Sequence, residues 1–306
     1  MSKIKSWTKA FRLRTLPLSL SGIIFGSFIA FFNGFWNTKI FFLAVMTASL
    51  FQIVSNLAND LGDSQKGADN TERIGPTRVV QSGEVTYTQM KFAVVIFSFL
   101  SLLSSAFLIY YGTQKLSSSI LLFYTILALL CVLAAITYTI GKKAYGYYGF
   151  GDIFVYIFFG LVSVLGVYTL YSKSFDWINI LPASTVGLLS VAVLNLNNMR
   201  DRVNDANSGK YTLVVKIGPN WAKLYHSFLI LGGIITLLIF LMNMRTHTLK
   251  NEWLFLSLLP CIVLIFHLRK VLGTKFEKEF DPELKKVSIL TFSISILFMF
   301  GVLMSK

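Results

Sequence analysis

The chain has 306 residues, of which 55% are hydrophobic and only 14% are charged. Proteins that fold in water carry about 25% charged residues, so the composition excludes an ordinary soluble domain and a disordered chain. The two cysteines both lie in apolar runs and indicate no disulfide framework. A net charge of +14 is also typical of nucleic-acid-binding proteins. The positions of these charges indicate membrane topology instead, and we expect no nucleic-acid partner.

Long apolar runs recur from one end of the chain to the other. Each is close to the ~20 residues that a helix needs to cross the hydrocarbon core. The runs are continuous, whereas the strands of a membrane β-barrel alternate between apolar and polar residues. We therefore predict one all-α domain over residues 1–306, with membrane spans near 16–35, 39–58, 91–111, 117–138, 152–171, 177–198, 224–243, 253–269 and 286–304.

Lysine and arginine orient these spans, because cytoplasmic loops carry an excess of both. Most of them lie in the N-terminal tail and in the loops on its side of the membrane. The opposite side holds only Lys39, Lys115, Lys173, Arg245, Lys250 and Lys306. The N-terminus is therefore expected in the cytoplasm, and an odd number of spans places the C-terminus outside.

Aspartates gather at the end of the second span and again at the end of the sixth. Asp60 and Asp63 are three residues apart, so they share one face if the helix continues. Asp201 and Asp205 are four residues apart, one helical turn from each other. Four spans separate the two clusters, so both lie on the cytoplasmic side. Like charges this close repel each other, which predicts a compensating cation.

Oxygen ligands without cysteine or histidine favour Mg²⁺ over zinc or copper. In proteins Mg²⁺ usually takes one or two carboxylates and fills its other positions with water and phosphate oxygens. Two facing clusters therefore predict a site for Mg²⁺ with a diphosphate between them. Basic residues flank both clusters and are candidate phosphate contacts: Lys66, Arg73, Arg78, Arg200, Arg202 and Lys210.

Apolar spans beside a metal–diphosphate site suggest that the substrate is a lipid diphosphate. The expected chemistry is ionisation of an allylic C–O bond, with Mg²⁺ and basic side chains stabilising the departing pyrophosphate. The resulting carbocation needs a water-free cavity with aromatic faces. The sequence supplies 28 Phe and 13 Tyr, although aromatic residues are common in all membrane helices.

The motifs resemble those of the UbiA superfamily of intramembrane aromatic prenyltransferases. Asn59-Asp60-x-x-Asp63 is similar to the first motif of that family, and Asp201-x-x-x-Asp205 is similar to the second. Asp69 follows Asp63 by six residues rather than the four of the general pattern. That spacing, together with residues 137–152 and 198–213, resembles the 1,4-dihydroxy-2-naphthoate polyprenyltransferase branch of menaquinone synthesis.

The resemblance implies about nine helices around a central cavity that is open to lipid and capped by cytoplasmic loops bearing the Asp motifs. It implies Mg²⁺-dependent transfer of a polyprenyl group from its diphosphate to 1,4-dihydroxy-2-naphthoate in the cell (inner or plasma) membrane. Carbon dioxide is lost and demethylmenaquinone forms. The implied metal ligands are Asp60, Asp63, Asp69, Asp201 and Asp205.

Other residues acquire roles from the same resemblance. Asn59 and Asn198 are expected to supply neutral oxygen ligands or to support the metal site. Tyr138 or Tyr145 is expected to face the cation or to orient a naphthoate hydroxyl. The implied catalytic groups beyond the aspartates are Lys142 and Tyr138, and the implied diphosphate contacts are Asn59, Arg73, Arg78, Lys142, Asn198, Arg200 and Lys210.

Two alternatives remain open at this point. The same fold could use another aromatic acceptor, such as 4-hydroxybenzoate. The acidic clusters could instead be cation sites of a coupled membrane transporter, although transporter sites usually lie near the middle of the membrane. The histidines His226, His247 and His267 lie far apart in the sequence and predict no shared metal site.

Overall fold

The fold is a bundle of long helices, seen in a computed structural model that describes residues 3–70, 73–114, 116–247 and 252–305. Within these ranges there is no strand, and nine helical segments are long and apolar enough to cross a membrane. The predicted all-α architecture is therefore confirmed. The α-helices are α1 (Lys3–Phe11), α2 (Leu16–Phe32), α3 (Thr38–Gln65), α4 (Tyr87–Thr113), α5 (Ser118–Thr137), α6 (Gly151–Val155), α7 (Val167–Ser172), α8 (Ile180–Asn207), α9 (Leu213–His247), α10 (Leu259–Gly273) and α11 (Phe280–Met304).

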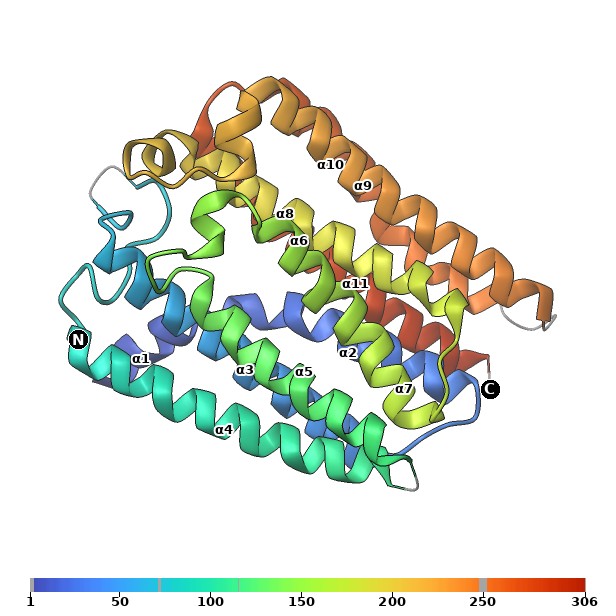
Figure 1. The fold of residues 1–306 in the computed structure, drawn as a ribbon. Coiled ribbons are helices and arrows are strands. Elements are labelled where there is room, and N and C mark those ends of the chain that lie inside the picture. Colours follow the sequence, from blue (N-terminus) through green and yellow to red (C-terminus); the bar gives the residue numbers. More distant parts are fainter. Residues whose placement is uncertain (1–2, 71–72, 115, 248–251, 306) are drawn as a thin grey trace.

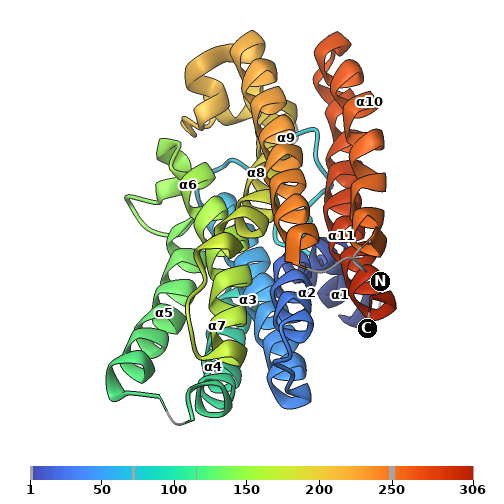
Figure 2. The ribbon, with the colours of Figure 1, turned by 90° about the vertical axis from the view of Figure 1, so that its right-hand side faces the viewer.

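The helices lie side by side with the two chain ends at opposite ends of the bundle (Figure 1). Helix α1 begins at the end where α3 and α8 terminate, and α11 finishes at the other end. We call the first of these the motif end, because it carries both aspartate clusters. Turned by 90°, the bundle has α4 and α5 on one side and α10 and α11 on the other (Figure 2).

Helices α3 and α8 continue beyond their apolar runs. Helix α3 extends to Gln65 and α8 extends to Asn207, so both aspartate pairs lie on the last turns of membrane helices. Gly67 follows α3 with a φ of +70°, a left-handed conformation that favours glycine and ends a helix. The helix therefore ends before Asp69, which lies in the loop that follows α3.

The fifth span changes its winding in mid-membrane. It begins as α6, continues as a π-helix over Tyr156–Gly166 and ends as α7. A π-helix is wider than an α-helix and is rare beyond a single turn, and π segments are frequent at functional sites. The π-helical winding therefore makes the fifth span a candidate part of a functional site.

The π-helix packs closely against α8 through two glycines. A Cβ atom on Gly160 would lie 2.6 Å from the carbonyl oxygen of Ala183 and 2.7 Å from the Cα atom of Gly187. Backbone atoms cannot move aside as a flexible side chain can. The two helices therefore need glycine at this crossing.

We expect Gly160→Ala to lower the free energy of unfolding by about 3 kcal/mol, since overpacking forces the backbone apart. The measurement is thermal unfolding of the detergent-solubilised protein. Gly273→Ala is the matched control, because a Cβ atom there meets no atom within 4 Å. Equal melting temperatures for the two variants would contradict the packing described for Gly160.

A buried polar chain joins the last three spans. The Nε2 atoms of His226 and His267 lie 2.8 Å apart, and His267 Nδ1 lies 2.5 Å from the carboxylate of Glu283. Lys270 and Lys286 also contact that carboxylate, at 3.0 and 2.8 Å. His226 and His267 are therefore neighbours in the fold although they lie far apart in the sequence, because α9 and α10 pack against each other. The side chain of His247 lies outside the described part of the chain.

Candidate active site

A cavity of about 410 Å³ lies inside the bundle, between α2, α3, α4, α5, the fifth span and α8. One face of α3 lines it at helical spacing, and from Ala44 to Asp63 this stripe extends about 28 Å along the helix axis. The stripe changes in character along its length, from mainly apolar to polar and then charged at the motif end. Its members are Ala44, Thr47, Ala48, Phe51, Gln52, Ser55, Asn56, Asn59 and Asp63.

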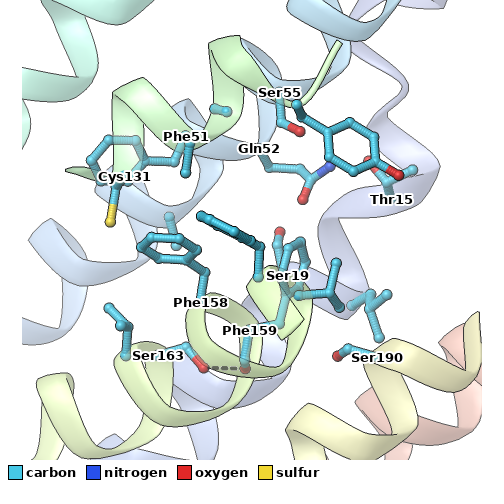
Figure 3. Close-up of a pocket in the computed structure, with 18 of the residues that line it drawn as sticks. Thr15, Ser19, Phe51, Gln52, Ser55, Cys131, Phe158, Phe159, Ser163 and Ser190 are labelled. Carbon is cyan, nitrogen blue, oxygen red and sulfur yellow. Dashed lines mark hydrogen bonds between the residues drawn. The ribbon is translucent and has the colours of Figure 1, made fainter. Parts of the chain in front are cut away.

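The fifth span forms the facing wall (Figure 3). Its lining residues come in neighbouring pairs four positions apart, at 154/155, 158/159, 162/163 and 166/167. On an ideal α-helix each successive pair would rotate by about 40° away from the cavity. The π-helix has more residues per turn than an α-helix, and these pairs stay on the cavity side of the span.

Aromatic side chains cover this wall next to the charged end. The rings of Tyr145 and Phe154 are stacked with centroids 3.9 Å apart, and Tyr138 meets Tyr145 edge-on at 5.3 Å. Tyr145 donates a hydrogen bond to the carbonyl of Ala134, which fixes its ring. Tyr138, Tyr145, Phe154 and Phe158 all line the cavity, so the predicted aromatic surface is present.

At the motif end the first aspartate cluster is paired with arginine. Arg78 lies 2.8 Å from a carboxylate oxygen of Asp63. Its Nε atom lies 2.9 Å from Asp69, although the two atoms are not aligned as a hydrogen bond. Tyr147 donates a hydrogen bond of 2.8 Å to the other oxygen of Asp63. Asp63 is therefore held from both sides by residues of different loops.

The second cluster is neutralised in the same way. Arg200 donates two hydrogen bonds to the carboxylate of Asp201, at 2.9 and 2.7 Å, and Lys210 lies 3.5 Å from Asp205. Arg200 also reaches Asp281 on α11, at 2.6 Å. Each acid of this pair thus has a basic neighbour within 4 Å.

Arg73 connects the two clusters. It lies 3.5 Å from Asp69 and 3.6 Å from Asp201, so one guanidinium contacts both motifs. The amide of Asn204 on α8 donates a hydrogen bond to the carbonyl of Ala68 in the loop after α3. The two clusters therefore lie at the same end of the bundle and close enough to share one ligand.

Burial shifts the proton affinities of the loop residues in this network. Burial and the nearby charge of Asp63 raise the pKa of Asp69 to about 6, against the opposing effect of Arg78 and Arg73. Burial alone would lower the pKa of Lys210, but the carboxylates of Asp63 and Asp205 outweigh it and raise that pKa. Lys210 therefore stays charged beside the cavity.

The oxygen atoms of this end fit a hard divalent cation. Several are buried and have no hydrogen-bond partner among the described residues: Asp60 Oδ1, Asp205 Oδ2, Asn198 Oδ1 and Asn204 Oδ1. In the described part of the chain no three acids, histidines or cysteines converge on one point. Basic side chains are paired with Asp63, Asp201 and Asp205 here, so a cation that binds must exchange partners with them.

The structure brings most of the predicted residues together. Six of them line the cavity, namely Asn59, Asp63, Arg73, Arg78, Tyr138 and Lys210. Six others are buried at the same end of the bundle, namely Asp60, Asp69, Asn198, Arg200, Asp201 and Asp205. Lys142 is different, because it is exposed on its loop and is not among the described lining residues. The loop turns at Gly141, whose φ is +100°, and Lys210 is the lysine that reaches the cavity instead.

Two further residues belong to the site and were not predicted as site residues from the sequence. Arg12 lines the cavity with a left-handed backbone (φ 48°), and its buried Nη2 atom has no hydrogen-bond partner among the described residues. Tyr147 holds Asp63 and carries Lys66 over its ring, 4.0 Å from the centroid. A non-glycine residue at positive φ is uncommon and costs energy, which is consistent with a functional position for Arg12.

The sequence matches the model of the UbiA prenyltransferase family over residues 19–281. The chain belongs to that family. A relative from Escherichia coli (strain K12) is 38% identical over the whole of this chain and 97% of its own length. It is named 1,4-dihydroxy-2-naphthoate octaprenyltransferase. A relative of the same name from Haemophilus influenzae is 40% identical over 98% of this chain and 96% of its own length.

Solved structures of this family share the fold. A UbiA homolog from Aeropyrum pernix K1 superposes with a TM-score of 0.65 at 15% identity, covering 97% of each chain. A UbiA homolog from Archaeoglobus fulgidus, bound to DMAPP and Mg²⁺, superposes with a TM-score of 0.59 at 13% identity. That alignment covers 95% of this chain and 99% of the homolog. The protein is thus a multi-pass membrane prenyltransferase of the UbiA type.

Proposed function

We propose that this enzyme transfers a polyprenyl group from polyprenyl diphosphate to 1,4-dihydroxy-2-naphthoate, with loss of CO₂. The observation that carries the proposal is the graded cavity face of α3, which is charged at Asp63 and apolar at Ala44. Such a cavity suits a ligand with an anionic head and a long isoprenoid tail. The names of the full-length relatives supply the acceptor and support a role in menaquinone synthesis.

In this mechanism the basic residues of the motif end seat the diphosphate. Arg73, Arg78 and Lys210 line the cavity there and can donate charge-assisted hydrogen bonds to phosphate oxygens. Bound Mg²⁺ would supply Lewis-acid assistance to the departure of pyrophosphate. We assign its ligands to Asp60, Asp63, Asp201 and Asp205, with Asn59 and Asn198 as neutral oxygens. Asp69, which is already paired with Arg73 and Arg78, is assigned as a weaker ligand.

The reacting carbon lies next to the aromatic wall. When the allylic C–O bond breaks, Tyr138 and the stacked Tyr145 present ring faces or edges to the forming cation and exclude water. The naphthoate ring carbon that bears the carboxylate forms the new C–C bond. Its bond to the carboxylate carbon then breaks and returns the electron pair to the ring. The products are CO₂, pyrophosphate and the quinol form of demethylmenaquinone.

We further propose that the motif end faces the cytoplasm and that the whole chain is one catalytic domain in the inner or plasma membrane. The excess of Lys and Arg on that side supports the orientation. A reporter fused after Lys306 should then be active only outside the cytoplasm.

A direct assay tests the reaction. Membranes containing the protein, supplied with labelled polyprenyl diphosphate, Mg²⁺ and 1,4-dihydroxy-2-naphthoate, should form a labelled quinol and one CO₂ per prenyl group. Chelation by EDTA should abolish turnover, and added Mg²⁺ should restore it. Turnover that survives full chelation would contradict the assignment of the oxygen ligands.

The same assay separates the alternatives. Prenylation of 4-hydroxybenzoate but not of the naphthoate would identify another acceptor within the family. Cation flux into proteoliposomes without any prenylated product would favour a transporter. The acids lie at helix ends, at the motif end of the bundle, whereas transporter sites usually lie near the middle of the membrane. Their position therefore favours an enzyme over a transporter.

A further inference from the structure

The hydroxyl of Ser190, in the cavity wall, has no hydrogen-bond partner in the described part of the chain. Ser190 lies on α8, lines the cavity and is 1% exposed, and its Oγ atom has no hydrogen-bond partner among the described residues. Figure 3 shows it among the side chains that surround the cavity, across from Thr15 and Gln52. A buried hydroxyl without a partner costs about 1–3 kcal/mol, so its presence calls for an explanation.

Two serines that line the same cavity from other helices, α2 and α4, avoid this cost. Ser19 donates to the carbonyl of Leu16 at 2.9 Å, and Ser105 donates to the carbonyl of Ser101 at 2.7 Å. Bonding back to the carbonyl one turn earlier is the usual solution for serine in a helix. Ser190 does not bond in this way, so its hydroxyl is available to a ligand in the cavity.

The depth of Ser190 indicates which part of the ligands it meets. It precedes Asp201 by three turns of α8, about 16 Å along the axis and on nearly the same helix face. That is too deep for a diphosphate held by Arg73, Arg78 and Lys210. A prenyl tail has no group that forms a hydrogen bond. The remaining candidate is a hydroxyl of the aromatic acceptor.

The chemistry of the acceptor agrees with that depth. The reacting ring carbon must lie about 3–3.5 Å from the first prenyl carbon, next to the diphosphate. That ring carbon bears the carboxylate, and one hydroxyl is adjacent to it. The second hydroxyl, at position 4, lies farther along the ring and points away from the charged end when the reacting carbon is in place.

We propose that Ser190 forms a hydrogen bond with the 4-hydroxyl of the dihydroxynaphthoate and so determines acceptor specificity. The inference rests on the proposed function and adds to it a residue that recognises the acceptor through a hydrogen bond. A site built to bond a hydroxyl discriminates strongly against an analogue that lacks it, because the protein group is then left unpaired.

The first test compares Ser190→Ala with the wild type in purified, detergent-solubilised enzyme. The KM for 1,4-dihydroxy-2-naphthoate should rise about tenfold, while the KM for the polyprenyl diphosphate should not change. The melting temperature should not fall, because the substitution removes an unpaired hydroxyl. Ser101→Ala is the control, since Ser101 is equally buried but bonds to the carbonyl of Ser98 and does not line the cavity.

The second test removes the hydroxyl from the ligand instead. 1-Hydroxy-2-naphthoate, used as a competitive inhibitor, lacks the 4-hydroxyl and should have the same inhibition constant with the wild type and with Ser190→Ala. The effects of the two deletions should therefore not add, as expected for partners in contact. If Ser190→Ala raised the inhibition constant of 1-hydroxy-2-naphthoate as much as it raises the KM of the acceptor, the proposed contact would be overturned.

The outcomes separate this inference from the proposed function. If the wild type prenylates the naphthoate and Ser190→Ala keeps its acceptor KM, only the role of Ser190 fails. If the wild type forms no prenylated naphthoquinol, the proposed acceptor fails and the inference fails with it.

Discussion

Asp63→Asn and Asp201→Asn are each expected to lower kcat by about 10³-fold, the loss seen when a group that stabilises transition-state charge is removed. Asn keeps the size of the side chain but removes the negative charge. Asp63 lies on the cavity wall between Arg78 and Tyr147, and Asp201 lies between Arg200 and Arg73. Each substitution therefore removes a negative charge from the centre of its cluster.

The measurement is the initial rate with saturating donor and acceptor across a titration of Mg²⁺. Both variants should also need more Mg²⁺ for half-maximal activity. Asp176→Asn is the matched control, because Asp176 caps a short helix at the opposite end of the bundle and Asn is an equally good cap. Rates near those of the wild type in Asp201→Asn would remove the second motif from the site.

Lys210→Ala is expected to lower kcat about 100-fold and to destabilise the fold by about 3 kcal/mol. Lys210 lies 3.5 Å from Asp205 and 5.6 Å from the ring centre of Tyr147. Removing it leaves the buried carboxylate of Asp205 without its basic neighbour, which is costly in a medium of low dielectric constant. The loss of a phosphate contact adds to the effect on turnover.

Single-turnover kinetics and a thermal melt measure the two effects separately. Lys210→Arg, which keeps the charge, should recover most of the stability. Lys142→Ala should stay within twofold of the wild type, because Lys142 is exposed on its loop. A larger loss in Lys142→Ala than in Lys210→Ala would reverse the assignment of the two lysines.

The sequence alone predicted the spans and the meeting of the two motifs. Continuous apolar runs of membrane length have few possible structures, and four intervening spans place Asp60 and Asp201 at the same end. The end of α3 before Asp69 was also predictable, because Gly67 interrupts the helical pattern.

Contacts between loops were not predictable in this way. The choice of Lys210 over Lys142 depends on how the loop turns at Gly141, and the bond from Tyr147 to Asp63 joins residues far apart in the chain. No periodicity encodes such contacts. The π-helix is also hidden in the sequence, since its residues are as apolar as those of any other span. The lack of a bond at Ser190 becomes visible only when its neighbours are placed.

The cavity face of α3, charged at one end and apolar at the other, also explains how the product is released. Both substrates arrive with a fixed negative charge, one on a diphosphate and one on a carboxylate, and the reaction detaches both. The joined molecule keeps only two hydroxyls, so the arginines and lysine beside Asp63 lose their hold on it. The product is then mostly hydrocarbon, like the surrounding lipid. It can leave the cavity for the bilayer without a carrier, because the reaction has removed the charged groups that held the substrates.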